Sequence, residues 1–119
     1  MCGVFGYLGQ SGQAAREVLA GLQRLEYRGY DSAGLCVVDS DHQTRVIRAV
    51  GKVSNLKSKT DTIDFAQFST GIGHTRWATH GGVTEANCHP HTSQSGRWIV
   101  IHNGIIENYS ELKSELIIK

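Results

Sequence analysis

The spacing of apolar residues along the chain predicts one amphipathic helix near the N-terminus and several short strands. From residue 13 to residue 25 apolar side chains recur every three or four positions, which indicates a helix with Ser11 as its N-cap and Gly29 just past its end. Runs rich in valine, isoleucine and aromatic residues predict strands, and these runs cover residues 2–9, 35–39, 44–50, 71–77 and 97–104. We expect the first of these strands to be buried, and the second and third to pair as a hairpin.

Polar segments connect these runs and end the chain. Residues 52–70 are polar with weak periodicity and predict a short helix and a loop. The connection at 78–96 holds the single proline and is long for a compact domain, which is typical of a functional or a disordered segment. Asn108 and Glu111 resemble a capping box, and the helical pattern then runs to Lys119 without a stop signal. We therefore expect a helix and a domain that continue past this chain.

Strands outnumber helices, so the sequence predicts an α+β fold in which helices cover an antiparallel sheet. A length of 119 residues suffices for one domain. Twelve basic and eleven acidic residues give a net charge of +1, which argues against partners such as nucleic acid or an anionic membrane surface and favours a small ligand. The three cysteines lack paired spacing, and no apolar run approaches the roughly 18 residues of a membrane span, so a protein of the reducing cytoplasm is predicted.

Cys2 directly follows the initiator methionine. Removal of the methionine would leave a free α-amino group on the same residue as the thiol. An amine is partly neutral near neutral pH and can accept the thiol proton, as an N-terminal amine does for a threonine nucleophile. Cys2 is therefore a candidate nucleophile. The alternative is a small apolar residue that happens to stand at the start of the chain.

Further candidates lie near the ends of predicted strands. Asn103 and Gly104 offer a side-chain amide and an accessible backbone N–H, the donors that a developing oxyanion requires, or else they form a turn between two strands. Arg76 presents a planar fork suited to a carboxylate, or else it makes a surface ion pair. Cys36, inside an apolar run, is expected to be an inert core thiol.

Other residues of functional type are explained without a ligand. Cys88, His89 and His91, with His80 as a possible fourth ligand, could suggest a metal site. Their spacing is too close for a recognised zinc site, so we expect no metal. A structural turn accounts for the segment Gly29–Ser32. The glycine spacing matches no nucleotide-binding motif, so no nucleotide cofactor is expected either.

Five motifs, in this order along the chain, resemble one family: MCGVFGY, LEYRGYDSAG, GIGHTRWATHGG, NCHPH and HNGIIENY. They are similar to the N-terminal glutaminase domain of the glutamine–fructose-6-phosphate aminotransferases, which are class II glutamine amidotransferases. The amino-acid sequences of the second and fifth motifs resemble this group more than the phosphoribosyl-pyrophosphate or asparagine-synthesising amidotransferases. The resemblance extends over nearly the whole chain.

This resemblance implies an N-terminal-nucleophile hydrolase fold, a four-layer αββα sandwich of antiparallel sheets that would be incomplete in this chain. It implies that Cys2 attacks the glutamine side-chain amide and releases ammonia, with Asn103 and Gly104 as the oxyanion hole. Arg76 would bind the substrate carboxylate, and the other residues that it places in or beside the site are Arg28, Gly29, Trp77, Thr79, His80 and His89. No metal or cofactor is implied.

The family also implies how this chain would relate to a longer enzyme. Residues 1–119 would be the N-terminal part of the glutaminase domain, and the sugar-isomerase domains that use fructose 6-phosphate would be absent. The parent enzyme would be a homodimer of the cytoplasm, without nucleic-acid or membrane partners. The alternative is a catalytically inactive fragment that acts only by associating with another protein through its open sheet edges and apolar faces.

Overall fold

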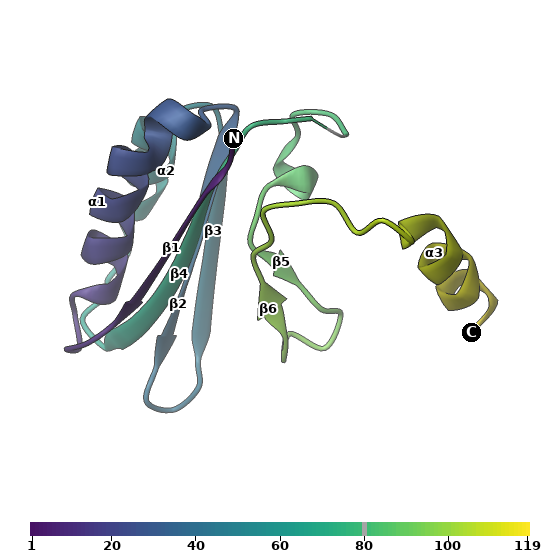
Figure 1. Cartoon of the computed structure of the whole chain (residues 1–119). Helices are drawn as coiled ribbons and strands as arrows, with labels where there is room; N and C mark the ends of the chain where they lie inside the picture. The colour runs from purple at the N-terminus through teal and green to yellow at the C-terminus, as the bar shows by residue number, and fades with distance from the viewer. Residues whose placement is uncertain (80) are drawn as a thin grey trace.

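The computed structural model describes residues 1–79 and 81–119, and its centre is a four-stranded antiparallel sheet (Figure 1). The strand order is β1-β4-β2-β3, so β1 and β3 form the two edges. The strands are β1 (Gly3–Leu8), β2 (Ser32–Asp39), β3 (Thr44–Val50) and β4 (Phe68–Arg76). The predicted hairpin of β2 and β3 is confirmed, with Leu35 opposite Ile47. Because β4 is central, the N-terminal strand pairs with residues about 70 positions later, with Gly3 opposite Thr75.

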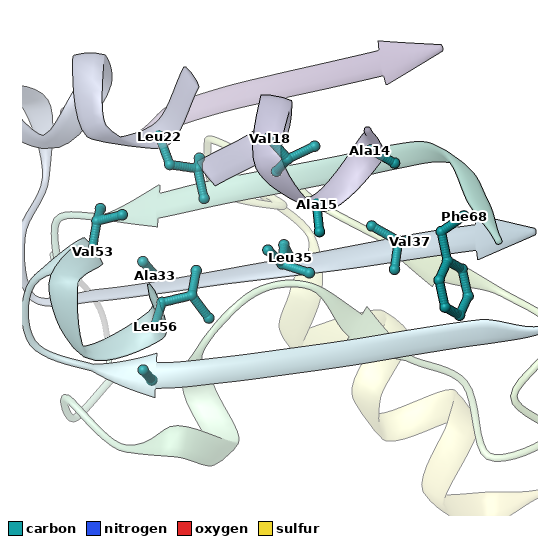
Figure 2. Packing of buried hydrophobic residues seen from close by; sticks show 11 residues of the cluster. Ala14, Ala15, Val18, Leu22, Ala33, Leu35, Val37, Val53, Leu56 and Phe68 are labelled. Atoms are coloured by element: carbon teal, nitrogen blue, oxygen red, sulfur yellow. The ribbon is translucent and has the colours of Figure 1, made fainter. Parts of the chain in front are cut away.

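Two helices cover one face of this sheet (Figure 1): α1 (Ala14–Leu25) packs on β1, β2 and β4, and α2 (Val53–Thr60) packs on β2 and β3. Val18 and Leu22 of α1 meet Leu35 and Val37 of β2 in the core, and Leu56 of α2 closes it at the β3 side (Figure 2). All five side chains are fully buried. Burying an aliphatic side chain of this size contributes about 1.5–3 kcal/mol, so this layer is the main source of stability.

The other face of the sheet carries smaller elements (Figure 1). A 3₁₀ helix, η2 (Glu85–Asn87), leads into a two-stranded sheet of β5 (His91–Thr92) and β6 (Ile99–Val100). The last helix, α3 (Tyr109–Ile118), stands apart and has no buried residue. The structure thus has a helical layer, a four-stranded sheet and a short second sheet, arranged as the first layers of an αββα sandwich.

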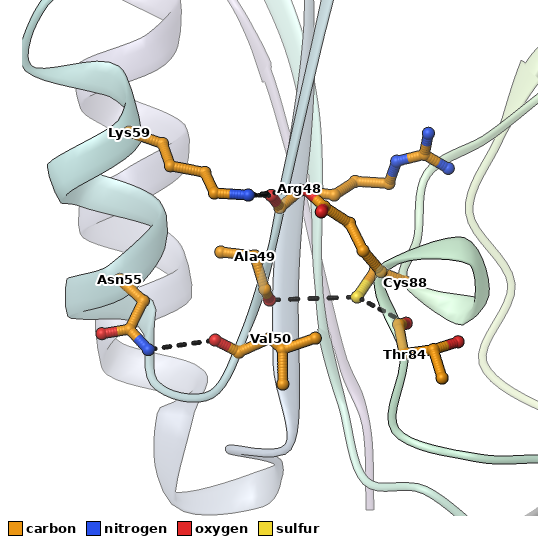
Figure 3. A network of polar contacts seen from close by, with 8 residues as sticks. Arg48, Ala49, Val50, Asn55, Lys59, Thr84 and Cys88 are labelled. Atoms are coloured by element: carbon orange, nitrogen blue, oxygen red, sulfur yellow. Dashed lines mark hydrogen bonds and ion pairs between the residues drawn. The ribbon is translucent and has the colours of Figure 1, made fainter.

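The edge strand β3 is covered by side chains from both sides (Figure 3). Lys59 and Asn55 of α2 donate to the carbonyl oxygens of Arg48 and Val50, at 2.7 and 3.0 Å. On the other side the buried thiol of Cys88 lies 3.9 Å from the Ala49 carbonyl oxygen and donates to Thr84 at 3.2 Å. The contacts of Lys59 and Asn55 occupy backbone acceptors that an open edge would offer to another strand, whereas the Ala49 carbonyl belongs to the side that pairs with β2.

Several local predictions are wrong. The strand expected at 97–104 is only two residues long, because β6 pairs with β5 alone and residues 101–104 make no ladder. The strand at 2–9 is an edge strand rather than a buried one, and Val4 and Leu8 on one face are exposed. Helix α1 begins after Gln13, not Ser11, and Asn108 precedes α3 without the side-chain bond of a capping box.

Candidate active site

The pleat of the sheet brings the first candidate residues together. In a strand, alternate side chains point to opposite faces. In β4, His74 lies opposite Val4, and Arg76 lies two residues further along. Both side chains therefore belong to the face turned away from α1. Cys2 stands one residue before β1 and has the same parity as Val4. The register places it next to the end of β4, and Cys2 does contact the following residue, Trp77.

The thiol of Cys2 is half-buried and is held by backbone groups. The backbone N–H of Trp77 donates to its sulfur at 3.2 Å, and the Trp77 carbonyl oxygen lies 3.7 Å from the same atom. The sulfur thus accepts from one backbone group of Trp77 and can donate to another, which fixes its position at the end of β4. Cys36, in contrast to Cys2, is fully buried, and burial raises the pKa of its thiol to about 11. The predicted inert core thiol is confirmed.

A cavity of about 350 Å³ opens beside Cys2. Seven of the residues singled out from the sequence line it, namely Cys2, Arg76, Trp77, Thr79, His89, Asn103 and Gly104. They come from the start of β1, the end of β4, the segment after η2 and the loop after β6. Residues far apart in the sequence thus converge on one concave site, which is the usual form of a small-molecule site.

Arg76 forms the floor of the site. Its side chain is buried at 9% exposure, so the surface ion pair considered from the sequence is wrong. Its Nη1 donates to the carbonyl oxygen of Gly82 at 3.0 Å, which fixes the guanidinium against the connection after β4. A guanidinium has five N–H donors, so it can hold this loop and also face an anion.

Asn103 reaches back to the N-terminus. Its Nδ2 donates to the carbonyl oxygen of Cys2 at 3.1 Å, which joins residues 101 positions apart. Gly104 has a φ of +154°, and no strand follows it before α3, so the turn between two strands is wrong. Asn103 and Gly104 therefore line the same cavity as Cys2.

A stack of imidazoles forms the wall of the cavity. The rings of His74 and His89 are stacked with centroids 4.2 Å apart, and His91 follows at 4.3 Å from His89. The pKa of His74 is lowered to about 3 and that of His89 to about 4, mainly by burial and then by the neighbouring histidines and Arg76. The backbone N–H of His102 donates to Nδ1 of His89 at 3.2 Å, so the proton of neutral His89 is assigned to Nε2.

The remaining predicted residues lie elsewhere. Arg28 and Gly29 do not line the cavity: Nη2 of Arg28 lies 3.5 Å from the Met1 sulfur, and Gly29 packs against the Arg76 backbone. His80 lies outside the described residues. Sequence reasoning gave no role in the site to the other six lining residues, Met1, His74, Asn87, His91, His102 and Ile105. For His74 a signal was available, because it shares a strand face with Arg76.

The chain is similar in sequence to longer proteins. It is 53% identical over 117 residues to glutamine–fructose-6-phosphate aminotransferase (isomerizing) of Streptococcus pyogenes serotype M3, and 51% identical over 123 residues to the same enzyme of Corynebacterium diphtheriae. Each match covers 98% of this chain but only 19% and 20% of the relative, so the chain spans about a fifth of their length. No family model matches the chain.

Solved structures give the fold. One neighbour, an allosteric regulatory enzyme of purine biosynthesis, has a TM-score of 0.82 and 26% identity over 99% of this chain and 25% of its own. The glutamine phosphoribosylpyrophosphate amidotransferase of Bacillus subtilis has a TM-score of 0.76 and 25% identity over the same shares. The chain has the N-terminal-nucleophile hydrolase fold of the class II glutamine amidotransferases. The fold predicted from the motifs is confirmed.

The sequence resemblance is confirmed as well, since the chain matches the N-terminal part of the aminotransferase along nearly all its length. In this fold Cys2 stands at the tip of an edge strand that borders a cavity. Among the described residues no helix is long and apolar enough to cross a membrane.

Proposed function

We propose that this chain is the N-terminal part of the glutamine-hydrolysing domain of an enzyme that converts fructose 6-phosphate and glutamine to glucosamine 6-phosphate and glutamate. The observation that carries the proposal is the convergence of Cys2, Asn103 and Gly104 on one cavity in a chain 53% identical to such an aminotransferase. The chain itself would contribute only the glutaminase half-reaction.

The chemistry follows from the neighbours of Cys2. Once Met1 is removed, the α-amine of Cys2 accepts the thiol proton, and the sulfur attacks the side-chain amide carbon of glutamine. The carbon–nitrogen bond then breaks, the same proton leaves with ammonia, and a thioester remains. Water hydrolyses the thioester to glutamate and restores the thiol, so no external oxidant or reductant is needed.

Two donors would stabilise the oxyanion of the tetrahedral intermediates. The amide of Asn103 has two N–H groups, of which the bond to the Cys2 carbonyl uses one. The second, together with the backbone N–H of Gly104, would donate to the oxyanion. Loss of one such donor typically lowers kcat by about 10²–10³-fold.

Recognition of glutamine is assigned to the other lining residues. Arg76 carries a positive charge into the cavity floor and would bind the α-carboxylate, while Trp77, Thr79 and His89 would border the side chain. For His80, Arg28 and Gly29 the roles implied by the family remain predictions. Two further points also remain predictions: the use of fructose 6-phosphate by other domains of a longer enzyme, and a homodimeric parent enzyme in the cytoplasm.

The experiment that tests this function is intact-mass measurement of the purified chain before and after 6-diazo-5-oxo-norleucine, an electrophile that mimics glutamine. We expect loss of the Met1 mass and then a single adduct, mapped to Cys2 by peptide mass spectrometry. Cys2→Ala should abolish the adduct. Cys36→Ala, which removes a buried thiol outside the cavity, should retain it.

The second candidate function, an inactive fragment that only associates with a partner, has one observation in its favour: α3 exposes Leu116, Ile117 and Ile118. The same labelling experiment separates the two. A retained methionine, or no adduct at Cys2, would refute glutamine hydrolysis by this chain and leave the activity to a longer protein.

A further inference from the structure

We propose that Asp31 is a positioning residue that holds the backbone N–H of Trp77 on the thiol of Cys2. Sequence reasoning explained Asp31 as part of a structural turn, and it does not line the cavity. The proposal rests on the proposed function of Cys2 as the nucleophile. It concerns the segment just after β4, where the sheet no longer holds the chain.

The strand ladder ends immediately before the residue that contacts the thiol. The last pair between β2 and β4 joins Ser32 and Arg76, and residues 77–79 belong to no strand. The conformation of Trp77 must therefore be fixed by something other than the sheet. Its indole touches Tyr30, with ring centroids 5.3 Å apart, but 41% of the residue is exposed, so side-chain packing holds it only in part.

Asp31 supplies the missing constraint from both sides of Trp77. Its backbone N–H donates to the Arg76 carbonyl oxygen at 3.1 Å, and its Oδ2 accepts from the backbone N–H of Ala78 at 2.7 Å. Asp31 is itself anchored, because its carbonyl oxygen accepts from Gly51 at 2.8 Å. The carboxylate–amide bond is short, as charge-assisted hydrogen bonds are.

Trp77, which lies between these two hydrogen bonds, contacts the thiol of Cys2. The N–H of Trp77 donates to the Cys2 sulfur at 3.2 Å, and a donor at this place stabilises the thiolate more than the thiol. This N–H belongs to the Arg76–Trp77 peptide, which the Asp31 backbone N–H holds, while the Asp31 carboxylate holds the following Trp77–Ala78 peptide. With Ala78 released, only the first of these two anchors remains, and Trp77 can shift so that its N–H no longer points at the sulfur. Asp31 thus acts on the nucleophile through the Trp77 backbone and not by touching it.

The carboxylate has a second, opposing effect that a variant can isolate. Its negative charge alone disfavours a thiolate nearby. Asp31→Asn removes the charge but keeps an oxygen that can accept from Ala78, whereas Asp31→Ala removes both. Comparison of these two variants therefore reports the hydrogen bond alone. The other ionisable groups at or next to the cavity are the N-terminal amine, Arg28, Arg76 and histidines 74, 89, 91 and 102, and all variants share them.

The experiment measures the rate at which iodoacetamide alkylates Cys2 in the full chain, followed by peptide mass spectrometry. At pH 7 we expect Asp31→Ala to react about three- to tenfold more slowly than Asp31→Asn. At pH 10, where an ordinary thiol is ionised, the two rates should agree. A loss of fold would change the rate at both pH values and would expose Cys36 and Cys88 to alkylation as well.

The matched control is Asp64→Ala. Oδ1 of Asp64 accepts from the Ala66 backbone N–H at 2.9 Å, a bond of the same kind before the opposite end of β4, so this variant should react at the wild-type rate. If Asp31→Ala does not fold, Asp31→Glu takes its place: it keeps the charge and moves the carboxylate by one methylene, and should react more slowly than wild type.

Equal rates for Asp31→Ala and Asp31→Asn at pH 7, or a wild-type rate for Asp31→Glu where the alanine variant is unfolded, would overturn the proposal. Iodoacetamide does not resemble glutamine, so this result is independent of substrate recognition. Failure of the diazo-norleucine label with a slow Asp31→Ala alkylation would refute the glutaminase function and leave the positioning role of Asp31 intact.

Discussion

At the scale of single residues, the backbone of Gly104 is the most demanding feature of the site. Its φ of +154° lies in a region that side chains rarely adopt, and a Cβ there would lie 3.0 Å from Nε2 of His102. Gly104→Ala should therefore turn the backbone N–H away from Cys2. We expect labelling by 6-diazo-5-oxo-norleucine to slow by at least tenfold, measured as adduct formation over time.

The control for this change is Gly6→Ala, because a Cβ at Gly6 meets no atom of the described residues within 4 Å and the strand backbone there is regular. It should label at the wild-type rate. Labelling of Gly104→Ala at that same rate would show that the Gly104 backbone has no part in the reaction.

At the scale of elements, a glycine in β2 determines how closely the loop around His89 approaches the sheet. A Cβ at Gly34 would collide with the carbonyl oxygen of His89. Gly34→Ala should therefore displace the segment that carries His89 and His91, and overpacking of this kind costs about 1–3 kcal/mol. Urea unfolding should show this loss of stability, and the cavity label should slow with it.

Gly6→Ala serves again as a control, since it adds the same methyl group to another strand of the same sheet without a contact. A Gly34→Ala protein as stable as Gly6→Ala would mean that the loop can move aside at no cost, and that its close approach to β2 is not needed for the fold.

At the scale of the whole molecule, the buried histidines couple stability to pH. In the folded protein the pKa of His74 is about 3, chiefly because of burial, against an ordinary value near 6.5. Between these values the unfolded chain binds more protons, so stability is full above pH 6.5 and falls as the pH is lowered toward 3. From pH 7 to pH 5 we expect a loss of about 2 kcal/mol from His74, measured by urea unfolding.

His74→Gln should reduce this pH dependence, whatever its effect on stability at pH 7. His42→Asn, at an exposed histidine in the β2–β3 turn, should leave the dependence unchanged, and asparagine suits its φ of +62°. An identical fall in stability for His74→Gln and wild type would assign the effect to other groups.

Periodicity predicted the central elements because their side chains alternate between core and surface. It found α1, the β2–β3 hairpin and the strand that ends at Arg76, and strand-end placement brought Arg76 and Cys2 into one site. It failed where a tertiary partner decides the outcome. Residues 101–104 have strand-like composition but no neighbouring strand, and the histidine stack depends on how the loop after η2 folds over β2.

The hydrogen bond from Asn103 to the Cys2 carbonyl joins residues that are synthesised at different times. The two partners are 101 residues apart, and cells translate about 5–20 residues per second. During synthesis the thiol therefore leaves the ribosome about 5–20 seconds before the amide that is to sit beside it. For that interval the nascent chain carries an unshielded nucleophile, and only near the end of these 119 residues can the pocket close around it.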